Sequence, residues 1–299
     1  MKILLLTQPI PAAPFAAAIH ALAPQHEFVE YRREIDERTL SDIEVVLGWQ
    51  MPRNLAGRMP RLRWVCAVAA GVDKLLAADL AGHVPVSRIV DAEQADGIAQ
   101  FVVLMALRHA RALPMYEAQQ RAHAWQRNPV AAVRSRVVVL GTGAMGGVVL
   151  RLLGAVGFET RGWSRRSAEP LEAVLASSDI VVCALPLTPQ TEGLLDARAF
   201  AAMPRGSYLI NVARGGHVVE ADLIAAVRSG HLAGAALDVQ RREPMAADDP
   251  LWDVPGITIT PHIAAQPSVP TIVAQFVEGL RRLERGEAPP QAIDRTRGY

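Results

Sequence analysis

The sequence predicts an α/β protein made of two domains, each with a doubly wound parallel sheet, and three observations carry this prediction. Short apolar, β-branched runs alternate with helical segments along most of the 299 residues, a pattern typical of parallel sheets. The chain is long enough for two domains, and 51% hydrophobic against 20% charged residues suffice for two cores. A glycine-rich turn also follows an apolar run near the middle of the chain, so the residues before it must build a separate domain.

The first 94 residues contain the elements of a small parallel α/β domain. The predicted strands are Lys2–Leu6, Val45–Leu47 and Trp64–Val68. The predicted helices are Ala12–Leu22 and Asp73–Leu80. The first apolar run superficially resembles a signal peptide, but Thr7-Gln8-Pro9 ends it early. A buried first strand is therefore the better interpretation.

Residues 95–124 are predicted to form one long helical stretch that is interrupted at Pro114. Its apolar residues lie on more than one face, which predicts burial on several sides. From Val137 the alternation resumes, and six strands are expected: Val137–Leu140, Thr160–Trp163, Ile180–Ala184, Tyr208–Asn211, Gly234–Leu237 and Thr258–Thr260. The expected helices are Leu171–Ala176, Ala197–Met203, Ala221–Ser229 and Thr271–Arg285. Six strands match a doubly wound nucleotide-binding fold.

The most informative stretch is the turn Gly141-Thr142-Gly143-Ala144-Met145-Gly146, which follows the strand Val137–Leu140 and precedes a helix-forming segment. This G-x-G-x-x-G pattern in this context is typical of dinucleotide binding. The first glycine permits the tight turn, the second lets the backbone approach the phosphates, and the third lets the helix pack against the strand. The phosphates would lie on backbone N–H groups at the start of the helix.

The residues after the strand Thr160–Trp163 indicate which dinucleotide is bound. NAD-selective sites usually have Asp or Glu there, which binds the ribose 2′-OH. This chain has Ser164-Arg165-Arg166 instead, and guanidinium groups suit a 2′-phosphate. We therefore expect NADP(H) as the cofactor, with NAD(H) as the weaker alternative. The other interpretation of this segment is a solvent-exposed basic turn.

Three loops that follow predicted strands carry Arg214, Glu243 and His262. Ligands of doubly wound sheets bind beyond the carboxyl ends of the strands, so these side chains can converge near a nicotinamide. The trio suits reduction of a 2-keto acid. The histidine donates a proton, the glutamate favours and orients the imidazolium, and the arginine holds the substrate carboxylate. Each residue taken singly is more commonly a packing or exposed residue.

The motifs around these residues resemble the D-isomer-specific 2-hydroxyacid dehydrogenase family. Its signatures N-x-A-R-G, D-V-x-x-x-E-P and P-H-x-A match Asn211–Gly215, Asp238–Pro244 and Pro261–Ala264, in the family's order. Pro186–Thr191 resembles its P-L-T-x-x-T segment. The resemblance spans essentially the whole chain and is strongest to the glyoxylate/hydroxypyruvate reductase A branch. Matching segments of that branch are Trp163-Ser164-Arg165, His217–Glu220, Arg242-Glu243-Pro244 and Asp294–Tyr299.

The resemblance implies a role for each matching residue. His262 would be the proton donor, Glu243 its partner and Arg214 the substrate-binding cation. The implied substrate-binding residues are Trp49, Ala70, Gly71, Arg214 and His262. With the turn and the basic segment above, the expected cofactor-binding residues are Gly141, Thr142, Gly143, Ala144, Met145, Gly146, Ser164, Arg165, Arg166, Leu185, Pro186, Val212, Ala213 and Asp238. Trp49 can be interpreted nearly as well as an aromatic residue of the core that does not contact the substrate.

The chain departs from the family pattern at two places, which bear on substrate preference more than on activity. Gln240 stands where an aromatic residue is common, and Gln100-Phe101 replaces the usual Glu followed by an aromatic residue or His. The family fold implies a discontinuous, flavodoxin-like substrate domain at 1–94 plus 267–299, with an inserted Rossmann domain at 95–266. It also implies a homodimer through residues 95–124.

The implied activity is NADPH-dependent reduction of glyoxylate to glycolate and of hydroxypyruvate to D-glycerate. Two alternatives stay open, namely a reductase of a bulkier acid such as phenylpyruvate and a non-catalytic, NADP(H)-sensing corepressor-like protein. The net charge of +1 speaks against nucleic acid or an acidic membrane as a partner, and we expect no membrane span. Cys66 and Cys183 lie in apolar runs, which predicts that both are buried free thiols. Free thiols in turn indicate a protein of the reducing cytoplasm, and we expect no metal site.

Overall fold

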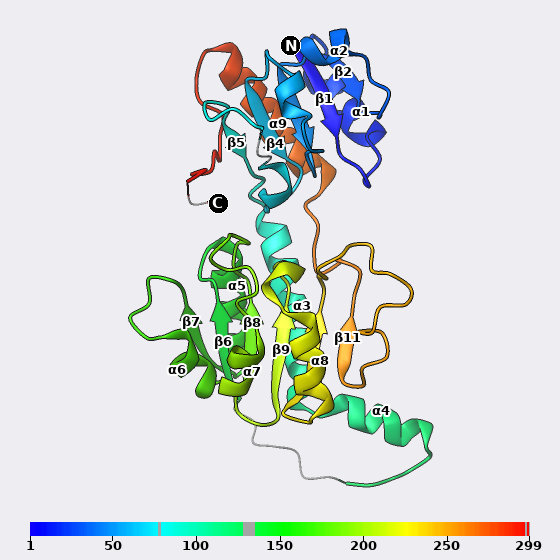
Figure 1. The fold of residues 1–299 in the computed structure, drawn as a ribbon, viewed down its shortest axis with the longest axis vertical. Coiled ribbons are helices and arrows are strands. Elements are labelled where there is room, and N and C mark those ends of the chain that lie inside the picture. The colour runs from blue at the N-terminus through cyan, green and yellow to red at the C-terminus, as the bar shows by residue number, and fades with distance from the viewer. Residues whose placement is uncertain (77–78, 128–134, 297, 299) are drawn as a thin grey trace. The chain divides into compact units, whose positions relative to one another are not determined.

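The chain divides into two compact units, each built around one parallel sheet with helices on both faces (Figure 1). The computed structural model describes residues 1–76, 79–127, 135–296 and 298. The first unit consists of Met1–Ala92 together with Gln266–Tyr299, and the second is Glu93–Ala265. The second unit is thus an insertion in the sequence of the first. The predicted fold class of two parallel-sheet α/β domains is confirmed.

The first unit has a five-stranded sheet in the order β2-β1-β3-β4-β5. Its strands are β1 (Lys2–Leu6), β2 (Glu27–Glu30), β3 (Val45–Gly48), β4 (Trp64–Ala67) and β5 (Val86–Ser87). All neighbouring pairs are parallel. The strand order 2-1-3-4-5 is that of flavodoxin-like folds, in which ligands bind where the winding reverses, between the first and third strands.

Both faces of this sheet are buried because successive residues of each strand point to opposite sides. Ile3 and Leu5 pack with helices α1 (Ala13–Leu22) and α9 (Val269–Glu284), whereas Leu4 and Leu6 belong to the core on the other face. Helix α2 (Glu37–Ser41) and two 3-10 turns, η1 (Ala56–Arg58) and η2 (Asp73–Leu75), lie around that second core. Residues far apart in sequence therefore share one core.

The second unit has a six-stranded sheet in the order β11-β10-β9-β8-β6-β7, again with parallel neighbours. Its strands are β6 (Arg136–Leu140), β7 (Glu159–Trp163), β8 (Ile180–Cys183), β9 (Ser207–Asn211), β10 (Leu232–Leu237) and β11 (Ile257–Ile259). Since β8 pairs with β6 and not with β7, the winding reverses between β6 and β8. Ligands of doubly wound sheets bind at such a switch point.

Helices cover this second sheet on both faces as well. The core that holds Val137 and Val139 includes residues of α3 (Ala92–Ala110) and α5 (Ala144–Ala155). The opposite core, with Val138 and Leu140, includes residues of α6 (Leu171–Ala176), α7 (Ala197–Ala202) and α8 (Glu220–Arg228). Burial on both faces explains why the inner strands β6 and β8 contain uninterrupted apolar runs, whereas the edge strand β7 does not.

Two predicted helices differ from the structure. The stretch expected at 95–124 forms two helices, because Ala112 adopts a left-handed conformation with a φ of 51° between α3 and α4 (Leu113–Arg121). Pro114 lies in the first turn of α4, where proline is tolerated because the first helical N–H groups need no intrahelical partner. Of the helix expected at Asp73–Leu80, only the 3-10 turn Asp73–Leu75 is formed among the described residues, and positions 77–78 lie outside them.

Three elements of the structure, β2, β5 and α2, are not predicted from the sequence. Strand β2 is an edge strand with half-buried or exposed side chains, and β5 has two residues, so neither carries an apolar pattern.

Both cysteines are free and buried. Among the described residues no helix combines the length and apolarity needed to cross a bilayer, and no three His, Cys, Asp or Glu side chains converge as a metal site requires.

Candidate active site

The site residues predicted in the second unit lie along one edge of its sheet. His262 follows β11, Glu243 follows β10 and Arg214 follows β9. Beyond them, Leu185 follows β8, the glycine turn follows β6 and Ser164 follows β7. Because the strands are parallel neighbours in that order, their carboxyl ends present these segments in one row. The histidine, glutamate and arginine come from three adjacent strands, and the basic segment from the opposite end of the row.

Each glycine of the G-x-G-x-x-G turn has its own steric environment. Gly141 has a φ of 100°, and a Cβ there would lie 2.5 Å from the carbonyl oxygen of Ala184. A Cβ on Gly146 would collide with the carbonyl oxygen of Gly141, so the helix starts in direct contact with the turn. A Cβ on Gly143 would meet no described atom within 4 Å. The turn thus has open space at its second glycine, where a pyrophosphate approaches the backbone in folds of this kind.

The first turn of α5 provides the donors for such an anion. Gly143 is the N-cap residue, and Ala144 begins the helix. The first N–H groups of a helix have no intrahelical acceptor and carry the positive end of the helix dipole, so they bind phosphate oxygens well. The N–H of Gly141 donates to the carbonyl oxygen of Trp163 at 2.8 Å, which ties this turn to the end of β7.

The basic segment after β7 is folded into a closed turn. The N–H of Ser167 donates to the carbonyl oxygen of Ser164 at 2.8 Å, and the N–H of Ser164 donates to Ser167 Oγ at 3.0 Å. The N–H of Arg166 donates to Ser164 Oγ at 3.3 Å. Arg165 and Arg166 therefore occupy the centre of the turn and are exposed. The turn follows β7, whose neighbour β6 leads into the glycine turn, so it lies where two guanidinium groups would suit a 2′-phosphate.

The segment after β8 is joined to the segment after β9 by a buried histidine. The ring of His217 is fully buried, with Nδ1 3.0 Å from the carbonyl oxygen of Arg214 and Nε2 3.3 Å from that of Pro186. Burial alone would lower its pKa, but Cys183 and the two carbonyl oxygens favour the protonated ring and raise the pKa of His217 to about 9. Thr191 Oγ also donates to the Pro186 carbonyl, at 2.8 Å. Pro186 is thereby fixed from two sides.

The histidine and glutamate predicted to act together are hydrogen-bonded to each other. His262 Nδ1 lies 3.1 Å from Glu243 Oε2, and the two side chains are 28% and 21% exposed. Their partial exposure leaves the ring accessible while one nitrogen is engaged. The second carboxylate oxygen, Glu243 Oε1, accepts from the N–H of Gln240 at 3.3 Å. The carboxylate is thus oriented by its own loop before it meets the histidine.

The backbone at His262 is strained and is held by Asp238. His262 has a φ of 57°, in the left-handed region that favours glycine, which costs about 1–3 kcal/mol for another residue. The N–H of His262 donates to the Asp238 carbonyl oxygen at 2.8 Å. The buried Asp238 carboxylate accepts from Ile263 N and Ala264 N, both at 2.9 Å, and from Thr260 Oγ at 2.6 Å. Such strain persists where the surroundings enforce it, as they commonly do at functional sites.

Gln240 connects the loops of the proposed trio. Its side-chain Nε2 donates to the carbonyl oxygens of Leu237, at 3.0 Å, and Thr260, at 3.3 Å. A Cβ on Gly215 would collide with the backbone of Gln240, so the Arg214 loop packs directly on the Glu243 loop. The polar residue at this position therefore has a structural function, which the sequence does not reveal.

Arg214 and the residues before it form a compact turn after β9. The Asn211 side chain donates from Nδ2 to the Arg214 carbonyl oxygen at 2.9 Å and accepts from Ala213 N at 3.1 Å. Arg214 Nη1 donates to the carbonyl oxygen of Ala213 at 2.7 Å. Val212 and Arg214 are half-buried, whereas Ala213 is buried. The turn thus presents a guanidinium group at the edge of the sheet next to the Glu243 loop.

The remaining predicted residues, Trp49, Ala70 and Gly71, belong to the first unit. They follow the adjacent strands β3 and β4, so they share the carboxyl edge of that sheet. Trp49 packs partly against the core, and Lys74 Nζ lies 5.1 Å from the centroid of its ring. Trp49 is therefore both a core neighbour and an edge residue, and Lys74 adds a cation that the sequence does not single out.

The chain is similar to known proteins of one family. A family model for the "D-isomer specific 2-hydroxyacid dehydrogenase, NAD binding domain" matches residues 103–264. The glyoxylate/hydroxypyruvate reductase A of Yersinia enterocolitica is 34% identical over 274 residues, which cover 86% of this chain and 88% of the relative.

Two solved structures have the same fold over the full chain. A D-isomer specific 2-hydroxyacid dehydrogenase from Xanthobacter autotrophicus, in complex with NADPH and MES, is 37% identical with a TM-score of 0.88, covering 100% of this chain and 99% of that one. An NADPH-dependent glyoxylate/hydroxypyruvate reductase from Sinorhizobium meliloti, in complex with NADP and sulfate, is 32% identical with a TM-score of 0.89 and the same coverage. The family model matches more than half of the chain, and with the identity to the Yersinia reductase this shows that the chain belongs to the D-isomer specific 2-hydroxyacid dehydrogenase family.

Proposed function

We propose that the protein reduces small 2-keto acids with NADPH, and that glyoxylate and hydroxypyruvate are its substrates. The observation that carries this proposal is the 3.1 Å hydrogen bond between His262 and Glu243, at the sheet edge that also holds the glycine turn. A positioned proton donor on the same sheet edge as a dinucleotide-binding turn suits reduction of a keto group. The names of the Yersinia and Sinorhizobium relatives support the choice of substrates.

The residues of the second unit fit NADPH, which supplies the hydride when bound. The turn from Gly141 to Gly146 and the start of α5 suit its pyrophosphate. Ser164, Arg165 and Arg166 suit its 2′-phosphate. Further expected contacts come from the segments after β8, β9 and β10, namely Leu185, Pro186, Val212, Ala213 and Asp238. NADPH and NADP in the Xanthobacter and Sinorhizobium structures support this cofactor.

We infer the chemical roles from the residue types and from the contact between His262 and Glu243. Because His262 Nδ1 faces Glu243, Nε2 is the atom that donates a proton to the keto oxygen. Glu243 holds the ring in that orientation. Arg214 binds the substrate carboxylate and polarises the keto oxygen as negative charge develops on it. The strained backbone at His262, held by Asp238, keeps the ring oriented before the substrate arrives.

We assign the first unit to substrate binding and the second to cofactor binding. In the first unit the backbone N–H groups of Ala70 and Gly71 would receive the substrate carboxylate, with Trp49 as a further substrate contact. Two features support this assignment, namely the position of these residues on adjacent strands at a carboxyl edge and the flavodoxin-like strand order.

A panel of 2-keto acids tests the proposed reaction. Loss of NADPH absorbance should be greatest with glyoxylate or hydroxypyruvate. Greater kcat/KM with phenylpyruvate would favour a reductase of bulkier acids, and no turnover with any acid would favour a nucleotide-sensing protein.

The cofactor preference is tested with Arg165→Ala and Arg166→Ala. Removing a charge-assisted contact to the 2′-phosphate should raise the Kd for NADPH roughly tenfold and leave the Kd for NADH within twofold. Arg198→Ala is the matched control, because Arg198 is an exposed arginine of α7 in the same unit. Equal kcat/KM for NADPH and NADH in the parent protein would overturn the proposed preference.

A homodimer through residues 95–124 is also proposed. Leu104 of α3 is 57% exposed and Leu113 of α4 is 45% exposed, and Trp125, just after this region, is 94% exposed. Apolar side chains exposed together commonly mark an interface. Light scattering should give twice the 32.2 kDa mass of the chain, and Leu104→Asp with Leu113→Asp should give the single mass. A parent protein of single mass would contradict the dimer.

A further inference from the structure

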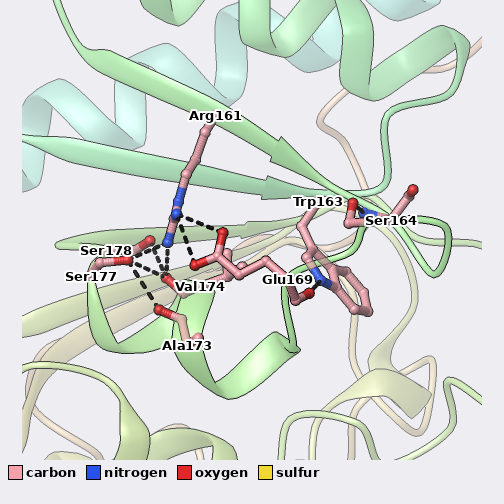
Figure 2. A network of polar contacts seen from close by, with 9 residues as sticks. Arg161, Trp163, Ser164, Glu169, Ala173, Val174, Ser177 and Ser178 are labelled. Carbon is pink, nitrogen blue, oxygen red and sulfur yellow. Dashed lines mark hydrogen bonds and ion pairs between the residues drawn. The ribbon is translucent and has the colours of Figure 1, made fainter.

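The loop 164–170, which joins β7 to α6, is held by side chains of β7 itself (Figure 2). Trp163 Nε1 donates to the carbonyl oxygen of Glu169 at 3.0 Å. Arg161 Nη1 lies 3.4 Å and 3.2 Å from the two carboxylate oxygens of Glu169. Two residues of one strand therefore bind the backbone and the side chain of a residue at the far end of the loop.

Arg161 also reaches the C-terminal end of α6. Its Nη2 donates to the carbonyl oxygen of Val174 at 2.6 Å and contacts Ser177 Oγ. Ser178 Oγ donates to the same carbonyl oxygen at 2.7 Å. A guanidinium at the C-terminus of a helix is favourable because it faces the last carbonyl groups. These contacts hold the guanidinium in one position, so it can hold Glu169 in turn.

Glu169 is the only acidic residue in the loop 164–170, whose other charged residues are Arg165 and Arg166. Figure 2 shows its carboxylate directed toward Arg161 and away from Ser164. The position of this carboxylate matters, because an acidic side chain beside the adenosine ribose favours a 2′-OH and repels a 2′-phosphate. If it were released from Arg161, the Glu169 carboxylate would lose its compensating guanidinium, and its negative charge would oppose the 2′-phosphate that the two arginines attract.

The small contribution expected of this ion pair to the stability of the unit indicates that its effect is local. The Arg161 and Glu169 side chains are 37% and 48% exposed, and exposed ion pairs contribute little to global stability. Loss of this pair should therefore change the field around the loop more than the stability of the unit. A site for a doubly charged phosphate group is sensitive to such a change.

We propose that Arg161 is a specificity-determining positioning residue, which holds the Glu169 carboxylate away from the 2′-phosphate of the cofactor. The inference rests on the proposed NADPH preference and extends it, since Arg161 contacts Glu169 and α6, not the cofactor. Arg165 and Arg166 attract the phosphate, and Arg161 pairs with the one carboxylate of the loop that would oppose it.

The test compares Kd values for NADPH and NADH in four variants. Arg161→Gln should raise the Kd for NADPH about tenfold and leave that for NADH within twofold, because only NADPH carries the phosphate. Arg161→Lys, which keeps the positive charge, should lie between Arg161→Gln and the parent. Glu169→Gln alone should bind NADPH as the parent does. The double variant Arg161→Gln with Glu169→Gln should recover parental NADPH affinity to within about threefold.

Arg136→Gln is the matched control. Arg136 forms a similar pair with Asp179, with Nη2 2.7 Å from Oδ1, at the amino end of β6. Its loss should leave the ratio of the two Kd values unchanged. The NADH affinity and the thermal unfolding of each variant show whether it is folded.

The outcomes separate this inference from the proposed function. A parent protein that binds NADPH and NADH equally would overturn both. A parent that prefers NADPH, with an unchanged ratio in Arg161→Gln, would overturn only the role of Arg161. A double variant as weak as Arg161→Gln would also overturn it, because the loss would then come from loop geometry and not from the released carboxylate.

Discussion

The N–H of His262 donates to the carbonyl oxygen of Asp238 at 2.8 Å, and this bond joins the segment after β11 to the segment after β10. The Asp238 carboxylate completes the connection by accepting from the next two N–H groups, of Ile263 and Ala264. The strained conformation of the proposed proton donor is therefore imposed by a buried acid 24 positions earlier in the sequence. Glu243, between them in the sequence, orients the ring.

Replacing the proposed proton donor should abolish most of the chemistry and leave the cofactor site intact. His262→Ala is expected to lower kcat by about 10²–10⁴-fold, because general acid catalysis contributes that much. The Kd for NADPH, measured by fluorescence titration, should stay within about twofold of the parent. Parental kcat in His262→Ala would show that the proton comes from another group.

Glu243→Gln should also lower kcat, by roughly 10²-fold, because the amide no longer orients the ring with a full charge. The control is Glu192→Gln, which removes a carboxylate from the exposed pair with Arg241 at 3.0 Å. Steady-state kinetics on both variants should show a loss for Glu243→Gln alone. Equal kcat values in the two would argue against a partnership between Glu243 and His262.

Removing the Asp238 carboxylate should destabilise the second unit. Three hydrogen bonds to a buried charged group are lost in Asp238→Ala, and buried donors are left unsatisfied. The expected loss is about 3 kcal/mol or more in the free energy of unfolding, measured in urea. The exposed Asp248 provides the control, since Asp248→Ala should change that free energy by less than about 0.5 kcal/mol. Similar curves for both variants would contradict the structural role.

The glycine turn allows binding and folding to be separated. A Cβ on Gly143 faces open space, so Gly143→Ala should keep the parental unfolding free energy yet raise the Kd for NADPH, because the methyl group lies where the pyrophosphate approaches. Gly146→Ala should destabilise the unit by roughly 1–3 kcal/mol, since its Cβ collides with the Gly141 carbonyl oxygen. Gly143→Ala should therefore change the NADPH titration and not the unfolding curve, whereas Gly146→Ala should shift the unfolding curve. Unchanged NADPH affinity in Gly143→Ala would place the pyrophosphate elsewhere.

The stability of the protein should depend on pH through His217. Its pKa of about 9 in the folded protein lies above the value of about 6.5 expected when unfolded. Protonation therefore stabilises the fold fully below about pH 6.5, and this contribution is lost as the pH rises to about 9. The difference in unfolding free energy between the parent and His217→Gln should fall across that range, as urea titrations at several pH values can measure. A difference independent of pH would mean that the ring is neutral in the folded protein.

Most strands and the row of site segments could be predicted from the sequence because they depend on local pattern. The run Val137–Leu140 is buried on both faces of its sheet, so it reads as an uninterrupted apolar segment. Arg214, Glu243 and His262 each follow a strand of this parallel sheet. They are therefore predicted at its carboxyl edge, where ligands bind. Strand β2 lacks such a pattern because it is an edge strand, and its pairing with β1 comes from the tertiary fold.

The sequence by itself determined the fold class, the glycine turn and the residue types needed for a reductase, because periodicity, turn chemistry and motifs act over short distances along the chain. Only the tertiary structure decided that Asp238 holds the backbone of His262, that His217 joins the segments after β8 and β9, and that Arg161 restrains Glu169. Each of these contacts joins different segments, and whether its atoms meet depends on strand register, helix position and turn geometry. Those quantities are set by the packing of the whole unit.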